Sequence, residues 1–417
     1  MPSLVLQPLT RVEGHGRIEL VLQEGRLQQA RVALIEAPRL FEKLVVGRSA
    51  TEVPDLICRI CAICSAVHKL AALVALERAL GFEVPPAAQL VRELLLLGGH
   101  IQSHALHLFC LILPDFTDQS CVLDLVRQGD PLAVGGIELK AFGNRLQEVA
   151  GGRVIHPVNA VLGGVVRCPP AADLAGLQRD CDGWLARWQS LAVDFAGAAR
   201  YPRAKPVVGT SLATGAGGRF ALSGDQLFLA GEAPMPLAEY ANLLGERVVS
   251  HSRARQSAGS RAPFLVGALA RQRLGVERSW PTAVPEPAVG IHGNNAAQVA
   301  EIGWALERVR EILAELRHLP EDVSLTTSAG PPRAGVGTAA FEAPRGLLIH
   351  HYVVDDWGQV AVADIITPTA INQLAMERQL FEDLAGIDDE TALRSSAARI
   401  VRAYDPCISC AVHVIQR

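Results

Sequence analysis

Two stretches near opposite ends of the chain carry the same pattern: Arg59-Ile-Cys-Ala-Ile-Cys-Ser-Ala-Val-His68 and Asp405-Pro-Cys-Ile-Ser-Cys-Ala-Val-His413. In each stretch two residues separate a pair of cysteines, a spacing that lets both thiolates reach one metal ion. A helix over the first stretch would place Cys61, Cys64 and His68 on one face. We therefore expect the fold to bring the two ends of the chain together around a single four-thiolate site.

Spacing alone leaves other interpretations of these cysteines open. The first pair could be two buried helix cysteines, and Cys58 could be either an additional ligand or a small core residue. Four thiolates also suit structural zinc or an iron–sulfur cluster. Zinc-ribbon sites usually close over tens of residues, whereas roughly 340 residues separate these two pairs. The wide gap indicates a site that is assembled late, inside a large fold.

Composition narrows the class of protein. Of 417 residues, 49% are hydrophobic and 20% are charged, which provides for a large core or a large subunit interface. The net charge of −4 gives no basis for binding nucleic acid or an anionic membrane surface. An odd count of nine cysteines, without a signal-peptide pattern, favours reduced thiols in the cytoplasm. The apolar stretch 94–113 contains three histidines, Gln102 and Ser103, so we expect a buried helix rather than a membrane span.

Periodicity predicts an α+β fold that is predominantly α-helical. Alternation over residues 16–35 predicts a β-hairpin, and residues 341–366 predict strands around a turn at Asp355-Asp-Trp-Gly358. Between 200 and 290 the chain is irregular, with short strands expected at 206–210 and 220–222. Apolar residues recur at helical spacing in 55–80, 87–113, 139–149, 171–198, 296–317, 369–385 and 390–401. No repeat or linker divides the sequence, so we expect residues 1–417 to form one domain.

Ordered motifs along the chain match a known family. They are Thr10-Arg-Val-Glu-Gly-His-Gly-Arg17, Arg39-Leu-Phe-Glu42 with Gly47-Arg48, the first cysteine stretch, Leu113-Pro-Asp115, His156-Pro157 with Gly163-Gly164, Glu342-Ala-Pro-Arg-Gly346, Thr367-Pro-Thr369, and the second cysteine stretch. In this order they resemble the large, catalytic subunit of nickel–iron hydrogenases, except that Ala62 stands where most members carry Gly. The resemblance implies that family's fold, with a central helical bundle and peripheral β-hairpins.

The resemblance implies a bimetallic centre held by both cysteine pairs. Cys61, Cys64, Cys407 and Cys410 would bind nickel. Cys64 and Cys410 would also bridge to an iron that carries carbon monoxide and cyanide. Soft thiolates suit both metals, whereas the diatomic ligands rest on the family alone.

Further residues would surround the iron ligands by the same resemblance. A fixed guanidinium beside bound cyanide is physically sensible, and Asp115 would hold that guanidinium in place with a contribution from Asp405. The residues expected around the iron ligands are Pro344, Arg345, Thr367 and Thr369.

A proton relay and a hard-cation site are also implied. Glu13 would be the first proton relay beside the thiolates, where burial favours a carboxyl pKa near neutrality. Glu42, His413 and the backbone carbonyl of Ile365 would hold magnesium or a similar hard cation. His68 would support the site by hydrogen bonding. Packing or supporting roles are expected for His15, His104, His107 and His156.

The implied activity is reversible heterolytic cleavage of H2. The proton would go to Cys407, or alternatively to Arg345, and leave through Glu13. The chain has no spare cysteine cluster to carry the electrons, so a small subunit with iron–sulfur clusters is expected as partner. The compact length favours the soluble cytoplasmic group that is linked to NAD(P) through flavin diaphorase subunits. In that group a short extension is removed, so we expect cleavage after His413 that releases residues 414–417.

Three other functions compete with this interpretation. An H2-sensing regulatory subunit would bind the gas at the same site but turn over slowly. A subunit of a membrane-bound energy-converting complex shares the fold, but its proton-pumping relatives that lack hydrogenase activity have lost the cysteines, which are retained here. A non-enzymatic zinc protein would contain zinc without nickel.

Overall fold

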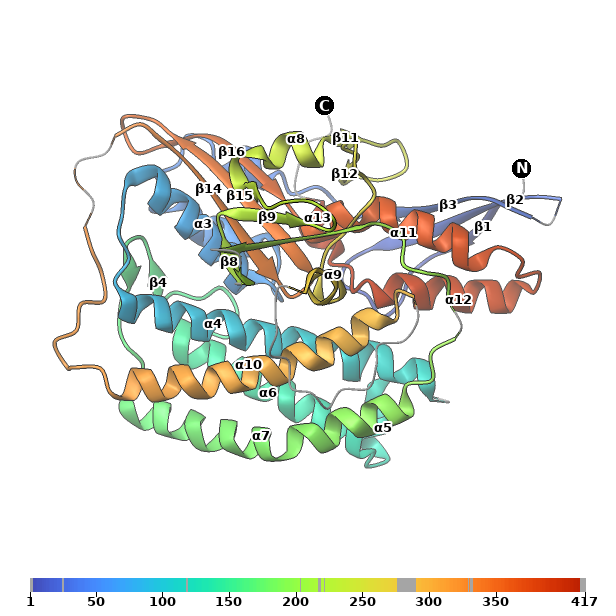
Figure 1. Cartoon of the computed structure of the whole chain (residues 1–417), viewed down its shortest axis with the longest axis horizontal. Coiled ribbons are helices and arrows are strands. Elements are labelled where there is room, and N and C mark those ends of the chain that lie inside the picture. The colour runs from blue at the N-terminus through green and yellow to red at the C-terminus, as the bar shows by residue number, and fades with distance from the viewer. Residues whose placement is uncertain are drawn as a thin grey trace.

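The structure is a computed structural model that describes residues 3–24, 26–117, 119–202, 204–216, 219–220, 222–275, 290–328, 330 and 333–412. Long helices form one layer, a mainly antiparallel sheet lies above them, and an N-terminal sheet extends to one side beside the last helices (Figure 1). Residues near the two ends of the chain meet, since the backbone of Glu13 pairs with that of Cys407. The mixture of a dominant helical layer with antiparallel strands confirms the α+β fold class that the sequence predicts.

The helical layer is built from α4 (Pro86–Ala105), α6 (Pro131–Gly151), α7 (Ala171–Ala198) and α10 (Gly293–Arg317), and a π-helical stretch η2 (Leu106–Ile112) continues α4. Glycines allow α4 and α6 to approach closely: a Cβ on Gly143 would lie 2.6 Å from the backbone nitrogen of Gln102. Within the described residues, one stretch, Pro86–Phe116, has the length and apolarity of a membrane span. Because 83% of its most apolar window is buried in protein, the prediction of a buried helix is confirmed.

The central sheet has the strand order β16 (Val360–Ile366), β15 (Gly346–Val354), β14 (Gly335–Ala343) and β8 (Ser223–Gly224). It packs on α3 (Ser65–Leu80), and the approach is close enough that a Cβ on Gly337 would lie 1.9 Å from the carbonyl of Ala75. Ala343 pairs with Gly346, so Pro344 and Arg345 alone form the hairpin turn between β14 and β15.

The third part of the fold joins the N-terminus to the C-terminal helices. Strands β1 (Ser3–Leu6), β2 (Gly16–Gln23) and β3 (Arg26–Leu34) form an antiparallel sheet, and α11 (Pro368–Leu384) packs on β3. Asp389 caps α12 (Glu390–Ala403) by accepting the backbone N–H of Ala392 at 2.7 Å. The short helix α13 (Ile408–Ala411) ends the described chain.

The remaining elements are short. They are α1 (Phe41–Val45), α2 (Val53–Ile57), η1 (Cys58–Ile60), η3 (Leu113–Phe116), α5 (Val122–Arg127), β4 (Ala160–Val161), β5 (Gly164–Val165), β6 (Thr210–Ala216), β7 (Arg219–Phe220), β9 (Gln226–Leu229), β10 (Met235–Pro236), η4 (Leu237–Glu239), α8 (Tyr240–Leu244), β11 (Glu246–Val248), β12 (Arg255–Ser257), β13 (Phe264–Leu265) and α9 (Ala268–Leu274).

Two local predictions are wrong. The helix expected over 55–80 is interrupted, because η1 ends at Ile60 and α3 begins only at Ser65. The strand expected at 206–210 begins at Thr210, where the parallel pairing with β13 starts.

Candidate metal centre

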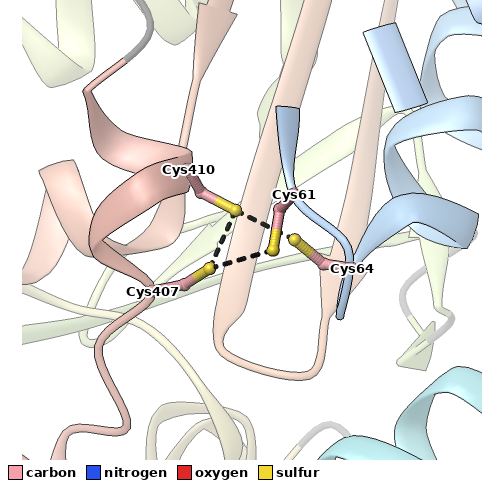
Figure 2. A group of neighbouring side chains, drawn as sticks. All are labelled: Cys61, Cys64, Cys407 and Cys410. Atoms are coloured by element: carbon pink, nitrogen blue, oxygen red, sulfur yellow. Dashed lines mark hydrogen bonds between the residues drawn. The ribbon is translucent and has the colours of Figure 1, made fainter. Parts of the chain in front are cut away.

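Four cysteine thiols converge in the interior, two from each end of the chain. The Sγ atoms of Cys61 and Cys407 lie 3.4 Å apart, and those of Cys64 and Cys410 lie 2.9 Å apart. The pair Cys407 and Cys410 is also separated by 2.9 Å, and all four sulfur atoms lie within 4.8 Å of one another (Figure 2). All four residues are buried. The two CxxC pairs therefore form one potential metal site, as their spacing predicts.

The local backbone that presents these thiols differs from the predicted helix. Cys61 is extended, with φ −148° and ψ 140°, and Cys64 is the N-cap of α3. The first pair therefore sits on the loop that enters α3, and only His68 lies within the helix. In the second pair Cys407 precedes α13 and Cys410 lies inside it. The expectation that Cys61, Cys64 and His68 share a helix face is wrong for this reason.

Arg39 holds the two cysteine stretches together. Its guanidinium donates to the backbone carbonyls of Arg59 at 3.3 Å and Ser409 at 3.0 Å, and also to that of Ile60. One side chain therefore bridges the loop before Cys61 to the helix that contains Cys410. Sequence analysis placed Arg39 in a motif but gave it no role.

Burial governs the protonation of the thiols. Hydrogen bonds with the other cysteines lower the pKa of Cys61 well below its usual value, whereas burial raises the pKa of Cys64, Cys407 and Cys410. The polypeptide alone thus favours one thiolate over several. A bound cation would stabilise the others, because coordination to a metal deprotonates thiols. Four sulfur donors suit soft transition metals better than magnesium or calcium.

A small cavity lies beside the cysteines, on the side of Cys64, Cys407 and Cys410. Its volume is about 10 Å³, about the least that a single water molecule occupies. Its lining combines apolar and functional groups: Cys64, Val67, His68, Ala343, Pro344, Arg345, Leu348, Pro368, Cys407 and Cys410. Cys61 does not line it, so the four sulfurs are not equivalent.

Arg345 is buried at this cavity. Its Nη1 donates to Ser103 Oγ at 3.1 Å, and its Nη2 lies 3.1 Å from Asp405 Oδ1. Its Nε has no hydrogen-bond acceptor among the described residues. Burial opposes the charge, but Asp405, together with the nearby cysteines, outweighs burial and raises the pKa of Arg345. A buried donor without an acceptor beside the cavity fits a small ligand that accepts a hydrogen bond.

The prediction that Asp115 holds Arg345 is wrong. Asp115 instead accepts from Arg402, with Nε at 2.9 Å and Nη2 at 2.7 Å, and from Arg11. Ser103 and Asp405 hold Arg345 in its place. Asp405 was expected only to contribute to holding Arg345. Ser103 belongs to no motif, so the sequence did not reveal it as a partner of Arg345.

Glu13 lies directly against the second cysteine pair. Its Oε2 accepts from Cys407 Sγ and from the backbone N–H of Ser409, both at 3.1 Å, and its Oε1 accepts from Ser409 Oγ. The backbone of Glu13 pairs with that of Cys407, and its carbonyl accepts from Ile408 N at 3.0 Å. Glu13 is half-buried whereas Cys407 is buried, so the carboxylate leads from the thiol toward the surface.

The other predicted residues fall around these groups. Thr369 Oγ1 accepts from the backbone N–H of Cys407 at 2.8 Å, and Thr367 is the buried N-cap of α11. Glu42 Oε1 accepts from the backbone N–H of Ile365 at 2.8 Å, so these two residues adjoin. His413 lies outside the described residues, as do residues 414–417.

His68 joins a buried chain of hydrogen bonds. Its Nδ1 lies 3.1 Å from Nε2 of His350, whose Nδ1 lies 3.0 Å from the hydroxyl of Tyr352. Because His68 lines the cavity and is connected to neighbours on β15, its ring is oriented by hydrogen bonds.

The sequence of this chain is similar to the sequences of known metal-dependent hydrogenases. The family profile described as nickel-dependent hydrogenase matches residues 39–132 and 282–413, and one described as HoxL-like matches residues 3–37. The chain is 36% identical over 431 residues to sulfhydrogenase 2 subunit alpha of Pyrococcus furiosus, covering 99% of each chain. It is 28% identical to NAD-reducing hydrogenase HoxS subunit beta of Cupriavidus necator, covering 99% of this chain and 95% of that one.

A solved structure of an NAD+-reducing nickel–iron hydrogenase in its H2-reduced state matches with a TM-score of 0.82 at 28% identity, covering 99% of this chain and 100% of that one. The chain therefore belongs to the nickel-dependent hydrogenase family and is a large, catalytic subunit of a nickel–iron hydrogenase. The four-cysteine cluster fits the metal centre of that family.

Proposed function

We propose that Cys61, Cys64, Cys407 and Cys410 bind nickel, and that Cys64 and Cys410 also bind an iron carrying carbon monoxide and cyanide. The cavity supports a separate role for Cys61, because Cys64, Cys407 and Cys410 line it and Cys61 does not. The division between Cys407 and the two bridging cysteines rests on the family resemblance. The donor Nε of Arg345 supports a hydrogen-bond acceptor such as cyanide beside the iron. When bound, the two metals supply the Lewis acidity and redox chemistry that cleave H2 heterolytically.

The side chains of this chain then accept the proton, orient the ligands and exclude water. Cys407 is the proposed first proton acceptor, since its Sγ already donates to Glu13 Oε2 across 3.1 Å. Arg345 is the alternative acceptor, but its raised pKa keeps it protonated and favours a role in orienting ligands. Glu13 passes the proton outward from the buried thiol to the half-buried carboxylate. Val67, Leu348 and Pro368 exclude water from the cavity.

We propose that Glu42, His413 and the backbone carbonyl of Ile365 hold magnesium or a similar hard cation. The Glu42 carboxylate already lies against the Ile365 backbone, and both are oxygen-bearing groups of the kind magnesium prefers. Arg255 approaches Glu42 Oε2 at 3.8 Å, so a cation would have to share that carboxylate.

Electrons are proposed to leave through an iron–sulfur small subunit. The relatives named above are subunits of hydrogenases with several subunits, which implies such a partner. We propose NAD(P), reached through flavin diaphorase subunits, as the final acceptor, because one relative and one solved structure are NAD-reducing enzymes. The odd number of nine cysteines does not suit a disulfide framework, which supports the proposed cytoplasmic location.

Infrared spectroscopy and metal analysis of the purified complex test this proposal together. Bands of metal-bound carbon monoxide and cyanide are expected, with one nickel per large subunit and iron in excess of nickel, because the proposed small subunit carries iron–sulfur clusters. Zinc without nickel, or matured protein without these bands, would overturn the assignment. Reduction of NAD(P) by H2 in the same preparation tests the acceptor separately.

A further inference from the structure

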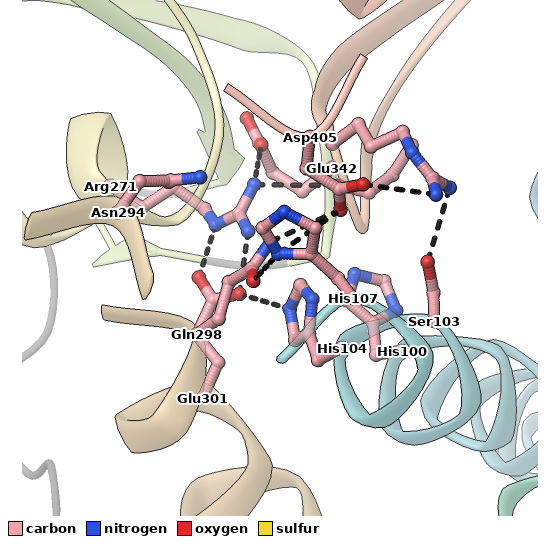
Figure 3. A network of polar contacts seen from close by, with 12 residues as sticks. His100, Ser103, His104, His107, Arg271, Asn294, Gln298, Glu301, Glu342 and Asp405 are labelled. Atoms are coloured by element: carbon pink, nitrogen blue, oxygen red, sulfur yellow. Dashed lines mark hydrogen bonds and ion pairs between the residues drawn. The ribbon is translucent and has the colours of Figure 1, made fainter. Parts of the chain in front are cut away.

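A second ionic cluster, formed by Arg271, Glu301 and Glu342, adjoins the turn that carries Arg345; Figure 3 shows these three side chains. Its centre is Arg271 on α9, a residue that is 2% exposed. Nε and Nη2 of Arg271 donate to the two carboxylate oxygens of Glu301 on α10, at 2.5 and 2.6 Å. Nη1 donates to Glu342 Oε2 on β14 at 2.6 Å. One buried guanidinium therefore connects two helices to the strand that leads into the turn.

The contact with β14 reaches the turn itself. Nη1 of Arg271 also donates to the backbone carbonyl of Ala343 at 3.4 Å. Glu342 is held from its other side, since Oε1 accepts the backbone N–H of Thr214 at 2.7 Å. Ala343 pairs with Gly346 and closes the hairpin. Arg271 therefore fixes the last two residues of the strand from which Arg345 projects.

Close backbone packing constrains the opposite side of this turn. Gly267, just before α9, lies so near that a Cβ on it would be 3.2 Å from the carbonyl oxygen of Arg345. Gly346 has φ +124°, and a Cβ there would lie 2.6 Å from the backbone nitrogen of Gly267. Any displacement of α9 would therefore be passed to the turn.

The same cluster also positions the hydrogen-bond partner of Arg345 on α4. Glu301 Oε2 lies 2.7 Å from His104 Nε2, and the neighbouring residue Ser103 accepts from Arg345. Burial lowers the pKa of His104, so its neutral ring can donate to Glu301. Arg271 is thus linked to both ends of the hydrogen bond between Ser103 and Arg345.

Stability alone is a weak reason for such a cluster. Burying a guanidinium with two carboxylates carries a desolvation cost that a well-packed apolar group would avoid. Buried ionic groups are better explained where they select one geometry.

We propose that Arg271 is a positioning residue for the metal centre. It sets the place and orientation of the Arg345 guanidinium over the cavity, through Glu342 and the turn on one side and through Glu301 and His104 on the other. This inference rests on the proposed function of Arg345 beside the iron ligands.

The test compares Arg271→Lys with Arg92→Lys in the complete complex. Lysine keeps the charge but cannot form the branched set of bonds. Arg92 is a matched control: it is buried, binds Glu77 with two bonds of 2.9 and 2.6 Å, and donates to backbone carbonyls, but does not contact the turn. Both variants are expected to lose similar thermal stability.

Only Arg271→Lys should alter the centre. Turnover with H2 should fall about 10- to 100-fold, since small misplacements near a reacting centre have effects of this size, while KM for H2 stays unchanged. The infrared bands of carbon monoxide and cyanide should shift. Amide hydrogen exchange across residues 339–349 should accelerate about tenfold, the signature of a turn that opens more often. Arg92→Lys should leave the bands and this exchange unchanged.

Equal bands and equal exchange in the two variants would overturn the proposal. If Arg271→Lys does not fold, the double variant Arg271→Gln/Glu342→Gln, which leaves the net charge of the cluster unchanged, is measured by the same readouts. Failure of the proposed function is distinguishable, because the unaltered complex would then lack the bands, while exchange over 339–349 still reports whether Arg271 fixes the turn.

Discussion

Replacing Asp115 by Asn should weaken the structure and misalign the proton relay at once. The Asp115 carboxylate accepts from Arg402 at the end of α12, three residues before Asp405, and from Arg11, two residues before Glu13. It thereby fastens the two segments that carry the thiol of Cys407 and its proton acceptor. An amide keeps the shape but removes the charge and turns one oxygen into a donor facing Arg402.

The expected loss follows from burial. Side chains of Asp115 and Arg402 are 6% and 4% exposed, so little water can replace the lost bonds. Breaking a buried ion pair costs about 3–5 kcal/mol, and we take about 3 kcal/mol because the amide retains one acceptor. An unfolding entropy of about 2.1 cal/mol/K per residue over 417 residues gives about 0.9 kcal/mol/K. The melting temperature should therefore fall by about 3 °C.

Differential scanning calorimetry and H2 turnover measured on the same preparation separate the two effects. Turnover per folded complex should fall about tenfold, because the Cys407-to-Glu13 hydrogen bond is loosened. Glu77→Gln is the control: it disturbs the buried ion pair between Glu77 on α3 and Arg92 on α4, and should cost similar stability without loss of turnover. Asp115→Asn with the melting temperature lowered but turnover intact would refute the link to the relay.

Four further outcomes are expected. Cys61→Ala should abolish nickel binding, whereas Cys58→Ala, a buried neighbour outside the cluster, should retain it; equal nickel content by mass spectrometry in both would contradict the ligand set. Glu13→Gln should keep nickel but slow H2/D+ exchange by about 10²–10⁴-fold, and unchanged exchange would exclude Glu13 as relay. Glu42→Gln should lower the magnesium content of the complex, and retention would rule out that site. Burial lowers the pKa of His100 to about 3, so between pH 6.5 and about 3 the unfolded chain binds a proton that the folded chain does not. Stability therefore falls as the pH is lowered through this range, and His100→Gln should reduce the pH dependence of the urea-unfolding free energy by up to about 1.4 kcal/mol per pH unit; an unchanged pH dependence would contradict a buried neutral ring.

Sequence reasoning was most reliable where local spacing carries the information. The cysteine pairs, the long amphipathic helices and the hairpin strands depend on neighbours within a few residues, and they are where the pattern predicts them. The helix over Cys61 and Cys64 was wrong because apolar spacing does not report that a loop must turn both thiols inward. The single-domain prediction and the removal of residues 414–417 stay predictions.

Pairings over long separations could not be predicted. Asp115 and Arg345 are both in motifs, but motif membership does not say which carboxylate meets which guanidinium, and Arg402 takes Asp115 instead. Ser103 looked like one polar residue in a buried helix, and Arg271 lay in an irregular region without any motif. Only the packing of α4, α9 and β14 brings these groups together.

Contacts outside the sulfur atoms hold the two cysteine stretches together. Arg39 bridges the carbonyls beside Cys61 to the carbonyl of Ser409, and the backbone of Glu13 pairs with that of Cys407. These contacts use peptide groups, so they do not depend on the protonation state of sulfur. What the polypeptide does not provide is charge, since burial favours neutral thiols at three of the four positions. Geometry set by the chain and charge supplied by the metal are therefore separate requirements, and substitutions at Arg39 should disturb the first while leaving the sulfur ligands themselves intact.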